Sequence, residues 1–107
     1  MMHNGNNENY AVLKTSEFTK WHSRLDPRSA LMVTARLDML SIGHFGNHKR
    51  FDGLIELRWK NGMRVYSFIW KKLVIVVLNG GNKNGQARDI KKAKKIRDQI
   101  IEEAYTV

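Results

Sequence analysis

The chain has 107 residues, 42% of them apolar, and its 19 Lys and Arg against 10 Asp and Glu give a net charge of +9. This length suits one domain with a modest core, and the apolar content argues against a wholly disordered chain. The absence of cysteine excludes disulfides, thiolate nucleophiles and Cys-ligated metal sites. The longest apolar run, Leu73–Leu78, is far shorter than the ~20 residues of a membrane span. We therefore expect a cytoplasmic domain without membrane segment, metal or cofactor, and a polyanionic or acidic partner.

The positive charge is concentrated in one stretch of the chain. Residues 1–42 carry net +1, residues 43–97 carry fourteen basic and three acidic side chains, net +11, and residues 98–107 carry net −3. The acidic residues at the end of the chain follow lysines at helical spacing. Ion pairs at i,i+4 within one helix therefore explain these acidic residues without any further function. A polyanion site is therefore expected in the second half of the chain.

The chain begins with a polar segment and continues into a strand and a helix. Residues 1–9 are Asn-rich and are expected to be a disordered lead-in, so the folded domain is expected to span residues 10–107. Residues 10–13 are a strand candidate. Ser16 is the expected N-cap of a first helix that runs to about Leu25, with apolar residues at spacings of three and four.

A second helix follows directly. Asp26 suits its N-cap and Pro27 its first helical position, where the missing N–H group costs nothing. The apolar pattern continues to about Ile42, and Gly43 is a plausible stop. Two consecutive helices with a tight junction predict a helical hairpin.

The second half predicts strands followed by one helix. Three strand candidates are joined by short turns, which implies antiparallel pairing. In order, we expect a loop at 43–52, strands at 54–59, 63–70 and 73–78, a Gly/Asn-rich loop at 79–85 and a helix at about 86–103. The fold class is therefore α+β: a small antiparallel sheet of about four strands packed against an N-terminal helical hairpin and a C-terminal helix.

The turn at residues 60–62 decides which side chains share a face of the sheet. A two-residue loop would place Arg58 opposite Val65, whereas a three-residue loop with Gly62 in the left-handed conformation places Arg58 opposite Arg64. Only the three-residue loop gathers the apolar side chains of both strands on one face, so we expect that register. The other face then carries Glu56, Arg58, Arg64 and Tyr66.

Two arginines that face each other across a strand pair repel. One interpretation is a solvated face on which Glu56 screens both charges. The other is a phosphate site, because two guanidinium groups offer bidentate donors to phosphate oxygens. Tyr66 would stack on a base or donate through its hydroxyl at such a site, and the alternative is a partly buried strand aromatic.

Other basic groups lie in the predicted loops. In the segment 79–85 the glycines let backbone N–H groups approach an anion near Lys83, although such a segment can also be only a turn. Lys49 and Arg50 form a third basic group. The four histidines show no metal-ligand spacing, and His48 is either a proton donor or an ordinary loop residue.

Five segments in order resemble one family of proteins. They are LDPRSA, ARLDMLSIGHFGNHKRF, ELRW, GMRVYSF and LNGGNKNGQARDIKKA. Together they resemble the RelE/ParE toxin superfamily, and within it the HigB-like "addiction module killer protein" branch of bacterial type II toxin–antitoxin systems. The resemblance implies a small antiparallel sheet packed against helices. Met63 stands where that family has an aromatic residue, and Asp89 and Ile90 occupy the stretch where some members carry a base-stacking tyrosine.

The resemblance implies an endoribonuclease that cleaves mRNA on the ribosome through basic side chains in place of a histidine pair. Carried over by motif, the catalytic residues would be Arg58, Arg64 and Lys83. We expect RNA contacts from Lys49, Arg50, Lys60, Tyr66 and Arg88. The alternatives are a ParE-like inhibitor of DNA gyrase and a non-catalytic nucleic-acid-binding module. The implied partner is a cognate antitoxin with a helix-turn-helix domain and an acidic segment that covers the basic face.

Overall fold

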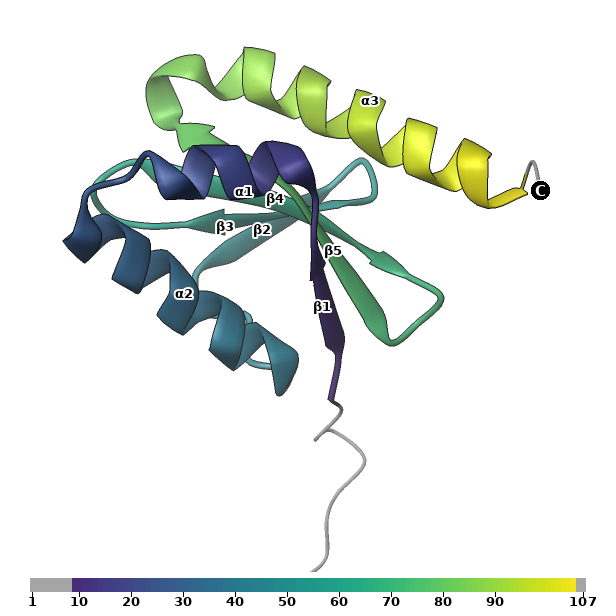
Figure 1. The fold of residues 1–107 in the computed structure, drawn as a ribbon, viewed down its shortest axis with the longest axis horizontal. Helices are drawn as coiled ribbons and strands as arrows, with labels where there is room; N and C mark the ends of the chain where they lie inside the picture. The colour runs from purple at the N-terminus through teal and green to yellow at the C-terminus, as the bar shows by residue number, and fades with distance from the viewer. Residues whose placement is uncertain (1–8, 106–107) are drawn as a thin grey trace, which may run out of the picture.

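A five-stranded sheet with helices on both faces forms the structure, a computed structural model that describes residues 9–105 (Figure 1). The elements are β1 (Ala11–Lys14), α1 (Ser16–Ser23), α2 (Pro27–Ser41), β2 (His48–Phe51), β3 (Leu54–Arg58), β4 (Met63–Trp70), β5 (Val74–Asn82), a 3₁₀ turn (Lys83–Gly85) and α3 (Gln86–Tyr105). The strand order is β1-β5-β4-β3-β2, with β1 parallel to β5 and the other neighbours antiparallel. The α+β class, the helical hairpin and the C-terminal helix are confirmed, with a mixed sheet of five strands in place of about four antiparallel ones.

The two N-terminal helices begin and end at capping residues. Thr15, one residue before the expected Ser16, caps α1 by accepting a hydrogen bond from the backbone N–H of Phe18 at 3.0 Å. Asp26 caps α2 as expected, accepting from Ser29 N at 3.1 Å, with Pro at the first position. Gly43 follows the end of α2 with φ of +85°, the conformation that favours glycine after a helix.

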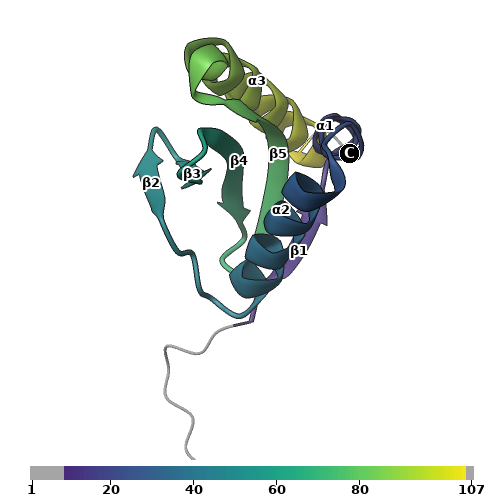
Figure 2. The ribbon, with the colours of Figure 1, turned by 90° about the vertical axis from the view of Figure 1, so that its left-hand side faces the viewer.

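Each face of the sheet has its own apolar core. Figure 2 shows α2 and α3 against different sides of the curved sheet. The side chains expected to share one face, from Ile55 to Ile69, pack together under α1 and α2. Leu54, Phe68 and Leu78 pack on the opposite face under α3. This division confirms the three-residue turn, in which Arg58 pairs with Arg64 and Gly62 has φ of +99°.

Two segments expected to be loops contain strands. β2 lies within the expected loop 43–52, and β5 continues through the expected loop 79–85 as far as Asn82. A Cβ atom on Gly80 would overlap the indole of Trp21, and one on Gly81 would overlap the carboxylate of Asp89. These glycines therefore stand in a strand because groups from both sides approach its backbone closely.

Two further observations concern the N-terminal segment and the apolar character of the helices. The lead-in expected for residues 1–9 lies, apart from Asn9, outside the described residues. Within residues 9–105, no helix combines the length and the apolar character needed to cross a lipid bilayer.

Candidate active site

The three basic residues implied as catalytic meet at one end of the β3–β4 hairpin. Arg58 and Arg64 are direct partners across the strands. The backbone N–H of Lys83 donates to Gly62 O at 2.8 Å, and the aliphatic part of the Lys83 side chain lies over Gly62. The 3₁₀ turn thus brings Lys83 to the same hairpin end as the two arginines.

A buried carboxylate holds one of the two arginines. The side chain of Glu56 is 0% exposed, and its Oε1 lies 3.0 Å from Nε of Arg58 in an ion pair. Gln86, the first residue of α3, donates from Nε2 to the other carboxylate oxygen at 2.6 Å. Glu56 is therefore not part of a solvated face, because α3 covers it. Its charge offsets the repulsion that the cross-strand pair would otherwise create.

The second arginine has no such partner. Nη1 of Arg64 donates to the backbone carbonyls of Met63 at 2.9 Å and Trp59 at 3.2 Å. Its Nε is buried without a hydrogen-bond partner among residues 9–105, and no carboxylate in that range forms an ion pair with it. Arg64 is thus held in place by neutral groups and keeps an uncompensated charge, which suits an incoming anion.

Two further ionisable groups lie beneath the start of α3. Tyr66 is fully buried in the α3 core, so its ring is not offered to a base in this structure. Burial, together with the charge of Glu56, raises the pKa of the Tyr66 hydroxyl. Asp89 rests against Gly81, which pairs with Arg64, and burial raises the pKa of its carboxyl group.

The remaining expected RNA contacts are divided between the two faces. Lys49 pairs with Glu56 and therefore shares the face of Arg58 and Arg64. Lys60 is exposed in the hairpin turn, and the side chain of Arg88 is 82% exposed near the start of α3.

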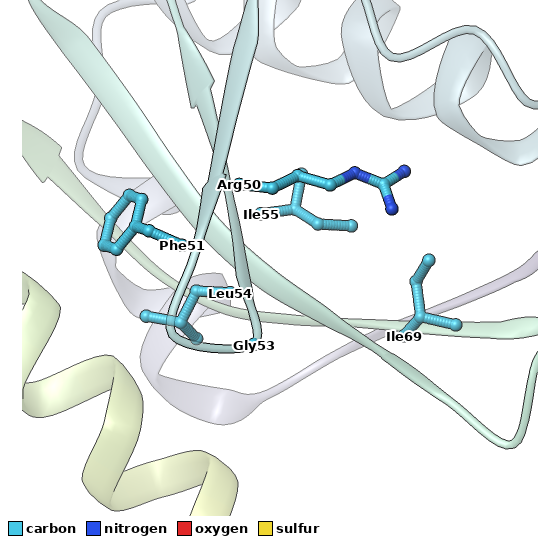
Figure 3. Close-up of a pocket in the computed structure, with 6 residues that line it drawn as sticks. All are labelled: Arg50, Phe51, Gly53, Leu54, Ile55 and Ile69. Carbon is cyan, nitrogen blue, oxygen red and sulfur yellow. The ribbon is translucent and has the colours of Figure 1, made fainter.

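Arg50 lies on the opposite face of the sheet. Its guanidinium group lies over the ring of Phe45, 4.9 Å from the ring centroid. It borders a hollow of about 180 Å³ with Ile55 and Ile69, whose side chains extend to the same side of the sheet in Figure 3. His48 also contacts Phe45 there. The structure therefore does not bring Arg50 or His48 to the Arg58–Arg64 pair, and the described residues contain no cluster of three potential metal ligands.

Residues that sequence reasoning left without a role complete the site. Gln86 binds Glu56, and the backbone carbonyl of Asp89 accepts from Nδ2 of Asn79 at 3.1 Å. Both lie in the segment GQARDI, one helical turn apart, so helical spacing would have placed them on one side of the helix. The family-like segment QARDI thus contacts both ELRW and LNGGNKNG at this end of the sheet.

Comparisons with known proteins give a sequence relative and a structural likeness. No protein-family model matches the chain. A protein of Haemophilus influenzae, named only "Uncharacterized protein", is 36% identical over 93 residues, which cover 83% of this chain and 94% of the relative. A chain in the crystal structure of the toxin–antitoxin complex RelBE2 from Mycobacterium tuberculosis superposes with a TM-score of 0.58 and 21% identity. The superposition covers 69% of this chain and 98% of that one, and it shows a shared RelE-like fold.

Proposed function

We propose that this chain, which belongs to one family with the uncharacterized Haemophilus influenzae protein, is the toxin of a toxin–antitoxin pair and cleaves RNA. One observation carries the proposal: Arg58 and Arg64 face each other across a strand pair, and only Arg58 is neutralised by a carboxylate. The RelE-like fold and the order of the family-like segments support it.

The proposed reaction is an internal transesterification. The 2′-oxygen of one nucleotide bonds to the adjacent phosphorus, the bond from phosphorus to the 5′-oxygen breaks, and a 2′,3′-cyclic phosphate forms. Arg64 and Arg58 would bind the phosphate oxygens, on which negative charge increases in the transition state. Lys83, at the same end of the hairpin, would donate the proton that the departing 5′-oxygen needs, while water would take the proton that the attacking 2′-hydroxyl gives up and return one to Lys83.

The shape of the site favours a substrate that a second macromolecule holds in place. Arg58 and Arg64 line neither the hollow beside Arg50 nor the larger hollow between α1 and α3, so the reacting phosphate would lie on an open face. Orientation of the reactants accounts for much of enzymatic rate acceleration. We therefore propose mRNA on the ribosome as the substrate, as in HigB-like toxins, which places its action in the cytoplasm.

The proposed partner is an antitoxin with an acidic segment. The uncompensated charge of Arg64 and the exposed Arg88 and Lys60 leave the face positively charged. An acidic chain that covered this face would block phosphate binding and gain from charge complementarity.

Replacement of Arg64 by alanine tests the proposal. We expect induction of the wild-type chain in bacteria to stop growth and to produce RNA fragments with 2′,3′-cyclic phosphate ends. Arg64→Ala should lower the cleavage rate by about 10²-fold, the usual loss for one preorganised donor, and restore growth. Growth curves and sequencing of RNA ends after induction measure both effects.

Lys95→Ala serves as the matched control, because Lys95 is an exposed cation of α3 that borders no part of this site. It should arrest growth as the wild-type chain does. An Arg64→Ala protein that cleaves RNA at the wild-type rate contradicts the proposal. Growth arrest with intact RNA and a DNA-damage response would instead indicate a gyrase inhibitor.

A further inference from the structure

A second basic surface lies between α1 and α3, at the outer edge of β5. A hollow of about 350 Å³ opens there, a size at the lower end of small-ligand sites. It is lined by Glu17, Lys20 and Trp21 of α1, Arg24 directly after α1, Asn79 and Gly80 of β5, and Lys92 of α3. Asn79 pairs with Tyr66 and so lies on the face of the Arg58–Arg64 pair, whereas Lys20, Trp21 and Arg24 lie at α1 on the other side of β5.

The hollow exists because β1 covers only part of β5. β1 pairs with β5 from Val74 to Val77, and Thr15 then donates through its backbone N–H to Val77 O at 3.0 Å and through its hydroxyl to Leu78 O. Beyond that point the chain turns into α1, and Trp21 lies directly against the backbone of Gly80. The Trp21 side chain stays half-exposed, so the groove has an aromatic wall.

The charges around the groove are mostly unbalanced. Lys20, Arg24 and Lys92 are exposed, and no ion pair within residues 9–105 involves any of them. The one carboxylate on the lining is that of Glu17, which accepts a hydrogen bond from Ser16 at 3.2 Å. Asp89, outside the lining, also interacts electrostatically with Lys92, so three cations stand against two carboxyl groups and the groove still favours an anionic ligand.

The floor of the groove contains an incompletely satisfied amide. Asn79 is 3% exposed, and its Nδ2 donates to Asp89 O. Its Oδ1 is buried and has no hydrogen-bond partner within residues 9–105. A buried acceptor without a partner is costly, so this position favours a ligand that brings a donor.

We propose that the groove binds one nucleotide of a single-stranded RNA. The base stacks on the indole of Trp21, and the flanking phosphates contact Lys20, Arg24 and Lys92. A base amino group or a ribose hydroxyl donates to Asn79. The inference rests on the proposed function, because it gives the RNA that reacts at Arg58 and Arg64 a second anchor on the same protein.

The experiment follows the three tryptophan indole N–H signals by NMR. The ¹⁵N-labelled full chain with Arg64→Ala, which slows the proposed cleavage about 10²-fold, is titrated with a mixed-sequence RNA hexamer. We expect the Trp21 signal to shift and saturate. The Trp59 and Trp70 signals should not move, because Trp59 is buried in the α1–α2 core and Trp70 contacts Tyr105 at the far end of α3.

Charge variants in the same Arg64→Ala chain test the phosphate contacts. Replacing Lys20, Arg24 and Lys92 together by alanine should weaken hexamer binding at least tenfold. It should also reduce the slope of log K against log salt by about 2, at ~0.7 per phosphate contact on a single strand. The matched control replaces Arg28, Lys91 and Lys95, three exposed cations outside the lining, and should change the slope less.

The outcomes separate this inference from the proposed function. A Trp21 signal that stays unmoved at saturating RNA overturns the nucleotide site, whatever the growth assay shows. A hexaglutamate peptide that shifts Trp21 when RNA does not would overturn it in favour of an acidic protein partner. A shift of Trp21 in a chain whose wild-type form neither arrests growth nor cleaves RNA supports the groove and contradicts only the nuclease.

Discussion

The two arginines of the β3–β4 hairpin differ in what surrounds them. Arg58 is held by the buried carboxylate of Glu56, whereas Arg64 is held by the backbone carbonyls of Trp59 and Met63. A guanidinium group that is fixed by neutral acceptors keeps its full charge for a ligand. Arg64 is therefore the better anion receptor of the pair.

Removal of the Glu56 charge tests this difference. Glu56→Gln leaves Arg58 without its ion-pair partner beneath α3, so we expect the free energy of unfolding to fall by about 1.5–3 kcal/mol, the usual worth of a hydrogen bond to a charged group. Denaturant titration measures the change. Glu103→Gln, at an exposed position of α3, should stay within ~0.5 kcal/mol of the wild type. An unchanged midpoint for Glu56→Gln would show that the buried pair adds nothing to stability.

At the scale of elements, polar contacts fix α3 to the turn between β2 and β3. Nζ of Lys94 lies 2.7 Å from Oδ2 of Asp52, and Nη1 of Arg97 donates to the backbone carbonyl of Asp52 at 2.6 Å. Asp52 itself has φ of +52°, a conformation that Asp and Asn tolerate better than most residues. The turn thus anchors the middle of α3, while Gln86 anchors its start through Glu56.

The hydrogen bond and charge of Lys94 lower the pKa of the Asp52 carboxyl group, with a smaller contribution from Arg97. A carboxyl group whose pKa is lower in the folded state adds stability above its unfolded pKa and loses it as pH falls through the folded pKa. We therefore expect Asp52→Asn to be less stable than the wild type at pH 7. The difference should shrink from about pH 4 downward, because the unfolded pKa is 3.8.

Denaturant titrations of both proteins between pH 7 and pH 3 measure that difference. Asparagine keeps the positive φ possible, so the backbone of the turn is preserved. Asp38→Asn, at an exposed position of α2 that forms no ion pair within residues 9–105, is the control and should follow the wild type. A gap between wild type and Asp52→Asn that widens as pH falls would contradict the assignment.

Local signals in the sequence were sufficient for most elements and for the hairpin register. Asp26-Pro27 predicts the start of α2, and the three-residue turn follows from keeping apolar residues on one face. β2 was missed because its sequence HKRF is an exposed edge strand without alternating polarity. The continuation of β5 was missed because Gly80 and Gly81 look like a turn until Trp21 and Asp89 are placed beside them.

In the candidate site, too, features set by local sequence could be predicted, whereas features set by contacts between distant segments could not. The pairing of Arg58 with Arg64 depends on a local turn, so it could be predicted. The burial of Glu56 and of Tyr66 depends on α3 packing across the sheet, a contact between segments some 30 residues apart. Periodicity within one element carries no information on such a contact. Whether these residues bind RNA stays a prediction.

At the scale of the whole molecule, β4 and β5 belong to both cores. Val65 and Val77 face α1 and α2, while their neighbours Tyr66 and Leu78 face α3. Because alternate residues of one strand point to opposite faces, neither core can lose its packing without disturbing the strands of the other. The fold should therefore behave as one cooperative unit.

Truncations in the two cores test that cooperativity. Leu37→Ala, on the buried face of α2, and Leu78→Ala, under α3, should each lower the free energy of unfolding by about 2–5 kcal/mol. In each variant, tryptophan fluorescence and far-ultraviolet circular dichroism should report the same midpoint, as in a two-state transition. Separate midpoints for the two probes would show that the two cores unfold independently. Thr19→Ala, at an exposed position of α1, is the control.

At the Gly80–Gly81 step of β5, side chains from two different helices lie directly against the strand backbone. Trp21 rests on it from one side and Asp89 from the other, and Gly81 is the strand partner of Arg64. A ligand that moved the indole would therefore press on the same two residues that support the arginine pair. Binding in the groove and binding at the hairpin would then be thermodynamically linked through the β5 backbone at Gly80 and Gly81. Each ligand would alter the affinity of the other by the same factor.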